Sequence, residues 1–289
     1  MTLPPFDLHR PESIEEALVL LESHGDDAVV MQGGTELLLL LKLGLADYGH
    51  IVDLKRIPEL RSLEADDGAL RIGAGVTHLE VERSALARGR WPALVRMERM
   101  VANIRVRAAG TIGGNLAFSD PHSDPATFLL ASDATVSLQS RSGARDLPIG
   151  DFLLGPYDTA LEPGELLARI DVPALPEGTR ILHSKLSFHE RPAATVTCLV
   201  RVADGSVAEA RVAVGSVGPV PVRSPDAERL LIGLDAEAPD AASVAEAGNA
   251  AAEAAHATAD SNGSVDYKRA LVATLVRRTF VAACAAPSP

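Results

Sequence analysis

The stretch Gly110-Thr-Ile-Gly-Gly-Asn-Leu-Ala-Phe-Ser-Asp-Pro-His-Ser-Asp124 decides how this chain folds. Two adjacent glycines, Gly113 and Gly114, stand between a β-branched pair and Asn115. Because glycine has no side chain, the pattern predicts a strand that breaks into a turn with a bare inner surface. We therefore expect another group to approach this backbone closely.

A second glycine turn, Gln32-Gly-Gly-Thr35, follows the apolar run 28–31 and precedes a helical pattern over 35–43. Unpaired N–H groups at a turn that leads into a helix favour negative charge, because the donors and the helix dipole both point at the ligand. Two such turns suit a pyrophosphate. Gly-Gly pairs also occur in tight turns that bind nothing, so one pair alone leaves both interpretations open.

The composition is that of a globular protein with two domains. The chain has 289 residues, of which 47% are hydrophobic and 23% charged, enough for two separate cores. A formal charge of -12, with no local basic patch, argues against nucleic-acid binding. We expect small molecules or other proteins as partners.

The cysteines and the apolar runs bear on the compartment. Cys198 and Cys284 fit neither a disulfide framework nor a metal spacing, and we expect both to pack in the core in a reducing cytoplasm. Residues 1–6 show no secretory signal. The run 37–45 is interrupted by Lys42 and Gly44, so it predicts a buried helix and no transmembrane segment.

Local signals predict the elements in order. Capping boxes at Ser13 and Thr77 each predict the start of a helix. Asp124-Pro125 predicts another helix, with Asp124 as its N-cap. Before residue 173 we also expect strands at 28–32, 51–54 and 134–138, a hairpin of 60–63 with 70–72, and a helix at 91–101. After a linker at 173–178 we expect long strands between 181 and 222, an Ala-rich helix within 236–259 and a last helix from 266.

The paired turns Gln32-Gly-Gly-Thr-Glu36 and Thr111-Ile-Gly-Gly-Asn115 resemble the FAD-pyrophosphate motifs of the molybdenum-hydroxylase flavoproteins. This family includes the FAD-binding medium subunit of carbon monoxide dehydrogenase and the FAD domain of xanthine dehydrogenase. Three further segments are similar to family segments, so the resemblance covers essentially the whole chain: 152–167, 185–191 and 267–280.

The resemblance implies an α+β fold with two domains. Residues 1–175 would form a two-subdomain FAD-binding domain of the PCMH or vanillyl-alcohol-oxidase-like type, with subdomains of about 1–55 and 56–175. Residues 179–289 would form a smaller C-terminal domain of the carbon monoxide dehydrogenase flavoprotein type, an antiparallel sheet with helices.

The resemblance also implies a set of FAD-binding residues. The first turn would wrap one phosphate side and the second turn the other, with Asp124 near the adenosine end, Leu167 lining the site and Lys185 close to the isoalloxazine. A cation there would raise the flavin's reduction potential. Gln32 stands where the family usually has Ala, and the segment after Arg191 lacks the family's Asp. The full set is Val30, Met31, Gln32, Gly33, Gly34, Thr35, Glu36, Leu37, Thr111, Ile112, Gly113, Gly114, Asn115, Asp124, Leu167 and Lys185.

The function implied is that of an oxidoreductase subunit that carries electrons. Electrons would pass from a [2Fe-2S] small subunit through non-covalent FAD to an external acceptor, in a heterotrimer or its dimer with a molybdenum large subunit. Molybdopterin and [2Fe-2S] would sit only on the partners, and we expect no catalytic side chain or metal ligand in this chain.

Several alternatives remain open from the sequence. One is a free-standing FAD-dependent oxidoreductase of the same fold, and another is a non-catalytic assembly protein without flavin. At single positions, Asp124 could serve only as a helix cap and Lys185 only as a strand-edge lysine. His122 is expected as an exposed loop histidine, with a flavin contact as the alternative.

Overall fold

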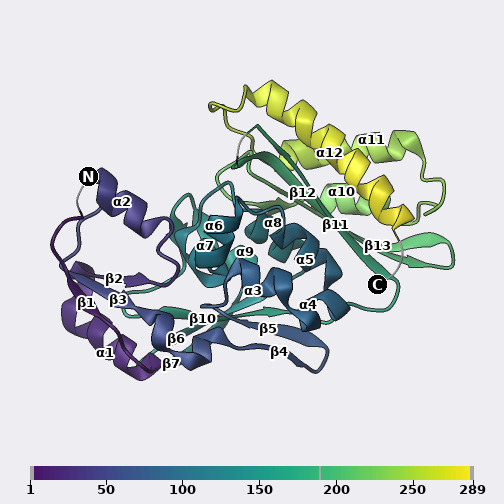
Figure 1. Cartoon of the computed structure of the whole chain (residues 1–289). Coiled ribbons are helices and arrows are strands. Elements are labelled where there is room, and N and C mark those ends of the chain that lie inside the picture. The colour runs from purple at the N-terminus through teal and green to yellow at the C-terminus, as the bar shows by residue number, and fades with distance from the viewer. Residues whose placement is uncertain (1–2, 189, 287–289) are drawn as a thin grey trace.

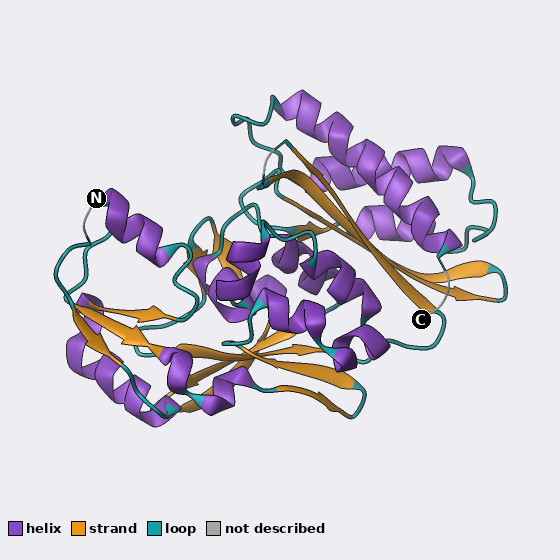
Figure 2. Cartoon of the chain, in the orientation of Figure 1, coloured by secondary structure: helices purple, strands orange, loops and turns teal. Residues whose placement is uncertain are grey.

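A computed structural model describes residues 3–188 and 190–286. Expectations that fall on residues 1–2, on His189 within the 185–191 segment, and on 287–289 lie outside the described residues. Three larger sheets follow one another along the described chain, with three, five and four strands, beside one two-stranded sheet (Figures 1 and 2). Helices cover the sheets and separate the second from the third (Figure 1).

The first sheet is parallel and has the order β1-β3-β2. On one face α1 packs against Val52, and on the other α2 packs against Ile51, both of which are fully buried. Helix α1 begins where expected, because the Ser13 hydroxyl accepts the Glu16 amide. The elements are β1 (Asp7–His9), α1 (Ile14–His24), the 3-10 turn η1 (Gly25–Asp27), β2 (Ala28–Met31), α2 (Leu37–Leu43) and β3 (His50–Asp53).

Helix α2 is less buried than its apolar sequence predicted. Leu41 is buried, but Leu39 and Leu43 are 47% and 50% exposed. The helix covers one face of a small sheet at the outer end of the molecule, so only the side that faces the sheet is covered (Figure 1). The expectation of a buried helix at 37–45 is therefore wrong for its outer side.

The second sheet is antiparallel and has the order β4-β5-β10-β6-β7. Its residues Ile72, Val136 and Ile170 are fully buried in the largest core. Its strands are β4 (Leu63–Asp66), β5 (Ala69–Gly73), β6 (Thr135–Ser140), β7 (Gly143–Pro148) and β10 (Leu166–Val172), and β8 (Leu153–Gly155) pairs separately with β9 (Asp158–Thr159). The helices of this region are η2 (Leu54–Arg56), η3 (Pro58–Arg61), α3 (His78–Arg83), α4 (Ala85–Arg90), α5 (Pro92–Glu98), α6 (Ile104–Ala109), α7 (Ile112–Phe118), α8 (Asp124–Ala131) and α9 (Ile149–Phe152).

Three expectations for this region are corrected. Leu60 and Arg61 end a 3-10 turn that begins at Pro58, so the hairpin strand begins only at Leu63. The glycines of the second turn do not end a strand; they lie in the first turn of α7, where Thr111 Oγ1 accepts the Gly114 amide at 3.0 Å. The N-cap of α8 is Ser123, not Asp124, because the Ser123 hydroxyl accepts the Ala126 amide.

The third sheet is an antiparallel meander in the order β11-β12-β13-β14. One face carries the C-terminal helices, and the other contacts α8 and α5 of the preceding region (Figure 1). Cys198 and Cys284 are buried here, as expected. The elements are β11 (Thr179–Ser187), β12 (Pro192–Ala203), β13 (Ser206–Gly215), β14 (Val222–Arg223), α10 (Pro225–Leu231), α11 (Ala241–Ala254) and α12 (Val265–Ala285).

None of the helices in the described part of the chain combines the length and the apolar character that a membrane-spanning helix requires.

Candidate functional site

The two glycine turns touch each other. A Cβ atom placed on Gly33 would lie 2.4 Å from the Ala109 carbonyl oxygen and 2.8 Å from Gly110 Cα. Real Cβ atoms do not approach backbone this closely, so only glycine allows the first turn to rest on the chain that enters the second. The first turn follows β2 and the second opens α7, and residues of both line the same cavity.

In the second glycine pair, Gly113 allows α7 to pack closely against the end of β5. A Cβ atom on Gly113 would lie 2.4 Å from Ala74 Cβ, at the end of β5. The amides of Ile112 and Gly113 donate to the carbonyls of Val76 and Ala74, and the Gly114 amide donates to Thr111 Oγ1. These donors at the start of α7 are thus already paired inside the protein.

The first turn differs in this respect. Within residues 3–188 and 190–286, no acceptor receives a hydrogen bond from the amides of Gly33, Gly34, Thr35 or Glu36. Gly34 has a left-handed φ of 71°, a conformation that suits glycine. Successive free amides in such a turn form a concave anion site. The sequence predicted unpaired amides at this turn, and the anion site itself stays a prediction.

A cavity of about 580 Å³ opens beside both turns, within the roughly 300–1,000 Å³ typical of small-molecule sites. Of the residues expected to bind the cofactor, Ile112 and Lys185 do not line it. Ile112 is fully buried in the core beneath α7. The expected residues that do line it are Val30, Met31, Gln32, Gly33, Gly34, Thr35, Glu36, Leu37, Thr111, Gly113, Gly114, Asn115, Asp124 and Leu167.

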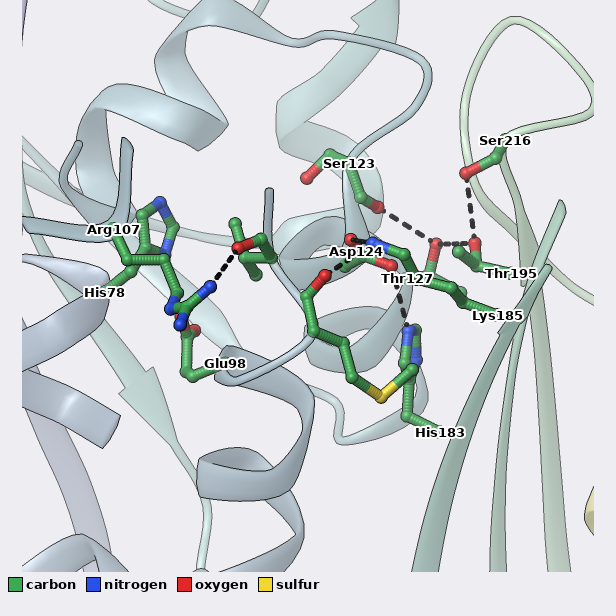
Figure 3. Close-up of polar contacts among 12 residues, drawn as sticks. His78, Glu98, Arg107, Ser123, Asp124, Thr127, His183, Lys185, Thr195 and Ser216 are labelled. Carbon is green, nitrogen blue, oxygen red and sulfur yellow. Dashed lines mark hydrogen bonds and ion pairs between the residues drawn. The ribbon is translucent and has the colours of Figure 1, made fainter. Parts of the chain in front are cut away.

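Lys185 lies behind the wall of this cavity. Its Nζ donates to Asp124 Oδ2 at 2.8 Å and to the Met100 carbonyl, while His183 Nε2 lies 3.2 Å from Asp124 Oδ1 (Figure 3). All three side chains are nearly buried. Because Ser123 caps α8, the Asp124 carboxylate is free to make these contacts. Strand β11 is thereby tied to the start of α8.

A second set of charges closes the cavity from the C-terminal side. Arg191 forms ion pairs with Asp120 at 2.9 Å and with Glu36 at 3.5 Å. Burial alone would raise the pKa of Asp120, but hydrogen bonds from His122 and the charge of Arg191 hold that pKa below its ordinary value. His122 is also 3.6 Å from Asp260 and its side chain is only 22% exposed, so the expectation of an exposed loop histidine is wrong.

The cavity contains groups that the sequence did not reveal. His78 lines it and its Nδ1 lies 2.8 Å from Glu98 Oε2, with both residues buried (Figure 3). Arg191 is the single Lys or Arg among the described lining residues. Neither belongs to a glycine turn, and only the fold brings them to the cavity. The capping box at Thr77 placed His78 on a helix but gave no sign of what that helix faces.

One polar atom of the Gln32 side chain lacks a hydrogen-bond partner. Its Oε1 atom is buried and has no partner among the described residues. The chain leaves room for it at Gly75, where a Cβ atom would lie 1.9 Å from Gln32 Nε2. Gln32 also lines the cavity, so an unpaired acceptor stands beside the four free amides.

Comparison with known proteins identifies the family. Residues 4–175 match the family model of the FAD-binding domain in molybdopterin dehydrogenase, and residues 188–283 match that of the carbon monoxide dehydrogenase flavoprotein C-terminal domain. The chain therefore belongs to the family of FAD-binding medium subunits of molybdenum hydroxylases.

Individual relatives agree over nearly the whole length. The chain is 35% identical to the carbon monoxide dehydrogenase medium chain of Hydrogenophaga pseudoflava, over 99% of both chains. It is 33% identical to the nicotine 6-hydroxylase medium subunit of Paenarthrobacter nicotinovorans, over 98% of this chain and 99% of the other. A solved structure of carbon monoxide dehydrogenase from Hydrogenophaga pseudoflava superposes with a TM-score of 0.94 at 34% identity and covers 99% of each chain.

Proposed function

We propose that the cavity beside the two glycine turns binds FAD without a covalent link. The observation that carries this proposal is the run of four unpaired amides from Gly33 to Glu36, on residues that line a cavity of about 580 Å³. Hydrogen bonds to a charged acceptor contribute roughly 1.5–3 kcal/mol each, so a few amides hold a phosphate firmly. The hydroxyl of Thr35 provides one more donor at the same turn.

The residues present fit a dinucleotide. The unpaired amides of Gly33 and Gly34 are available to donate to phosphate oxygens, and one cation, Arg191, lines the cavity while paired with Glu36 and Asp120. FAD, when bound, supplies the electron-accepting and electron-donating chemistry. This chain binds and orients it and excludes water from its ring, with no side chain required to act on an organic substrate.

We propose that Asp124 and Lys185 act together at one end of the site, as an ion pair. The resemblance assigned Asp124 to the adenosine end and Lys185 to the isoalloxazine, yet their 2.8 Å ion pair holds them together. Asp124 lines the cavity and Lys185 stands behind it. Lys185 then fixes the orientation and charge of Asp124, and Asp124 makes the contact with the cofactor.

We further propose a division of the chain into an FAD-binding domain, 1–175, with subdomains of about 1–55 and 56–175, and a C-terminal domain, 179–289. The three successive sheets support it. The residues 173–178 between the second and third sheets lack regular structure within the described chain. The C-terminal domain contributes Glu190, Arg191 and Pro192 to the cavity, so both domains are needed to close it.

In the complex, the proposed role is to carry electrons from a [2Fe-2S] small subunit to an external acceptor, in a heterotrimer with a molybdenum large subunit. The medium-chain and medium-subunit names of the relatives support this assembly. The test is mild purification from the native host, followed by the visible spectrum and mass spectrometry of the subunits. Flavin with a small iron–sulfur chain and a large molybdopterin chain supports the role. A flavoprotein that stays alone and turns over a substrate would instead support the free-standing oxidoreductase.

A further inference from the structure

Three histidines from separate elements meet at the first sheet. His9 ends β1, His24 ends α1 and His50 begins β3. One nitrogen from each lies within 4.8 Å of the other two. Nε2 of His9 is 3.0 Å from Nδ1 of His50, and the rings of His24 and His50 stack with their centroids 3.6 Å apart.

The backbone explains why they meet. β1 and β3 are parallel, with Asp7 paired to His50, so Asp7, His9 and His50 point to the same face of the sheet. Helix α1 covers that face and its last residue, His24, reaches the same point. None of the three histidines lines the FAD cavity, so this cluster is separate from the cofactor site.

Two carboxylates surround the cluster. Asp27 accepts the Gly49 amide at 2.8 Å through Oδ1, which leaves Oδ2 at 4.0 Å from His50 Nε2. Asp7 Oδ2 lies 3.9 Å from His50 Nδ1. Histidines that bind a metal commonly donate their other ring N–H to a carboxylate, which fixes the tautomer. Asp27 Oδ2, 4.0 Å from His50 Nε2, is the carboxylate oxygen that would move in to accept that N–H when His50 Nδ1 binds the ion.

We propose that His9, His24 and His50 form a binding site for a divalent transition-metal ion of the Zn²⁺ type. Imidazole nitrogens suit Zn²⁺, Cu²⁺ and Ni²⁺, and three of them with a fourth ligand complete a tetrahedral site for Zn²⁺. Zinc–nitrogen bonds of about 2.0–2.1 Å bring ligand nitrogens to about 3.3 Å from one another. The His24 and His50 rings stack at 27° to each other, so one of them must rotate out of the stack to turn a nitrogen toward a shared ion. Asp7 or water supplies the fourth ligand, and Asp27 orients His50.

The site would act as a clamp. It links the edge strand β1 and the end of α1 to the central strand β3, three segments that otherwise meet through strand pairing and packing. An ion that binds only the folded state stabilises it by mass action. The metal therefore supports the subdomain that carries the first glycine turn.

The test uses the full chain, untagged and freed of metal by a chelator, titrated with ZnCl₂ by calorimetry. We expect one Zn²⁺ per chain and a rise in melting temperature on adding Zn²⁺. Cobalt as a probe should give the visible bands of a tetrahedral ion. His24→Ala should abolish all three signals, and Asp27→Asn, which keeps an acceptor for the Gly49 amide, should weaken binding about 10–100-fold.

The matched control is His256→Ala, which removes an exposed histidine elsewhere in the chain. It should bind Zn²⁺ like the unaltered protein. The proposal is overturned if the unaltered chain gives no saturable binding, or if His24→Ala binds as tightly as His256→Ala. Since the circular dichroism of His24→Ala reports whether it is folded, loss of binding in a folded variant is assigned to the ligand.

Discussion

Lys185 on β11 donates to Asp124 at the start of α8 across 2.8 Å, and the two side chains are 9% and 4% exposed. The pair joins the third sheet to the helix layer that borders the cavity proposed to bind FAD. Breaking a buried ion pair by removing one partner leaves an uncompensated charge, which destabilises far more than the intact pair stabilises. Loss of either partner is therefore expected to destabilise the fold and to disturb the site.

Lys185→Met is expected to lower the free energy of unfolding by about 3–5 kcal/mol, because Asp124 is left buried and charged. Urea unfolding monitored by circular dichroism measures this. The double variant Lys185→Met/Asp124→Asn is expected to recover part of the loss, since the charge is then gone. A Lys185→Met protein of normal stability whose flavin potential falls would contradict this account and place Lys185 at the isoalloxazine.

Gly33→Ala is expected to abolish flavin binding, because its Cβ atom would lie 2.4 Å from the Ala109 carbonyl oxygen and push the two turns apart. The ratio of visible to ultraviolet absorbance in the purified protein measures bound flavin. Gly89→Ala in α4 is the control: nothing lies within 4 Å of its Cβ position. That control should retain flavin and gain about 0.5–1 kcal/mol of stability. Equal flavin content in the two variants would refute the contact between the turns.

Thr111→Val is expected to cost about 1 kcal/mol of stability, because α7 loses its N-cap and the Gly114 amide its acceptor. Thermal unfolding of the variant beside the unaltered chain provides the measurement. Thr111→Ser keeps the hydroxyl and should restore the lost stability. If Thr111→Val and Thr111→Ser melt together, the cap does not contribute.

Asp120 is expected to make stability depend on acid pH. Burial alone would raise the pKa of Asp120, but the hydrogen bonds from His122 and the charge of Arg191 hold this pKa below its ordinary value of 3.8. A lowered carboxyl pKa contributes stability that is present above 3.8 and is lost as the pH falls through the lower folded-state value. Asp120→Asn should therefore be less stable than the unaltered chain at neutral pH, and the difference should shrink below pH 3.8. A difference that stays constant through this range would show that Asp120 does not contribute through its charge.

The first glycine turn was predictable because its signal is local, whereas the second pair, expected to end a strand, lies in the first turn of α7. A Gly-Gly pair permits backbone conformations and close approaches that other residues cannot make, whatever surrounds it. What the pair does is not local: Gly33 and Gly34 leave amides free, whereas Gly113 lets α7 pack on Ala74 and the amides of that turn are paired. The sequence alone cannot distinguish these two uses, since the difference depends on which strand ends beside each turn.

The ion pairs of the site were beyond prediction for the same reason. Asp124-Pro125 looks like a cap followed by the first helical residue, yet Ser123 takes the cap and frees Asp124 for Lys185. Arg191 reaches the cavity from the residue just before β12, and His78 from the start of α3. No spacing in the sequence links either residue to a glycine turn. Packing of the domains decides these contacts, so they become visible only in three dimensions.

The most direct measurement of the central claim is a titration of flavin-free chain with FAD, followed by flavin fluorescence, for the unaltered protein and for Gly33→Ala and Gly89→Ala. We expect one FAD per chain in the unaltered protein and in Gly89→Ala, released intact on acid denaturation, and no saturable binding in Gly33→Ala. Failure of the unaltered, folded chain to bind FAD, or unchanged binding by Gly33→Ala, would contradict it.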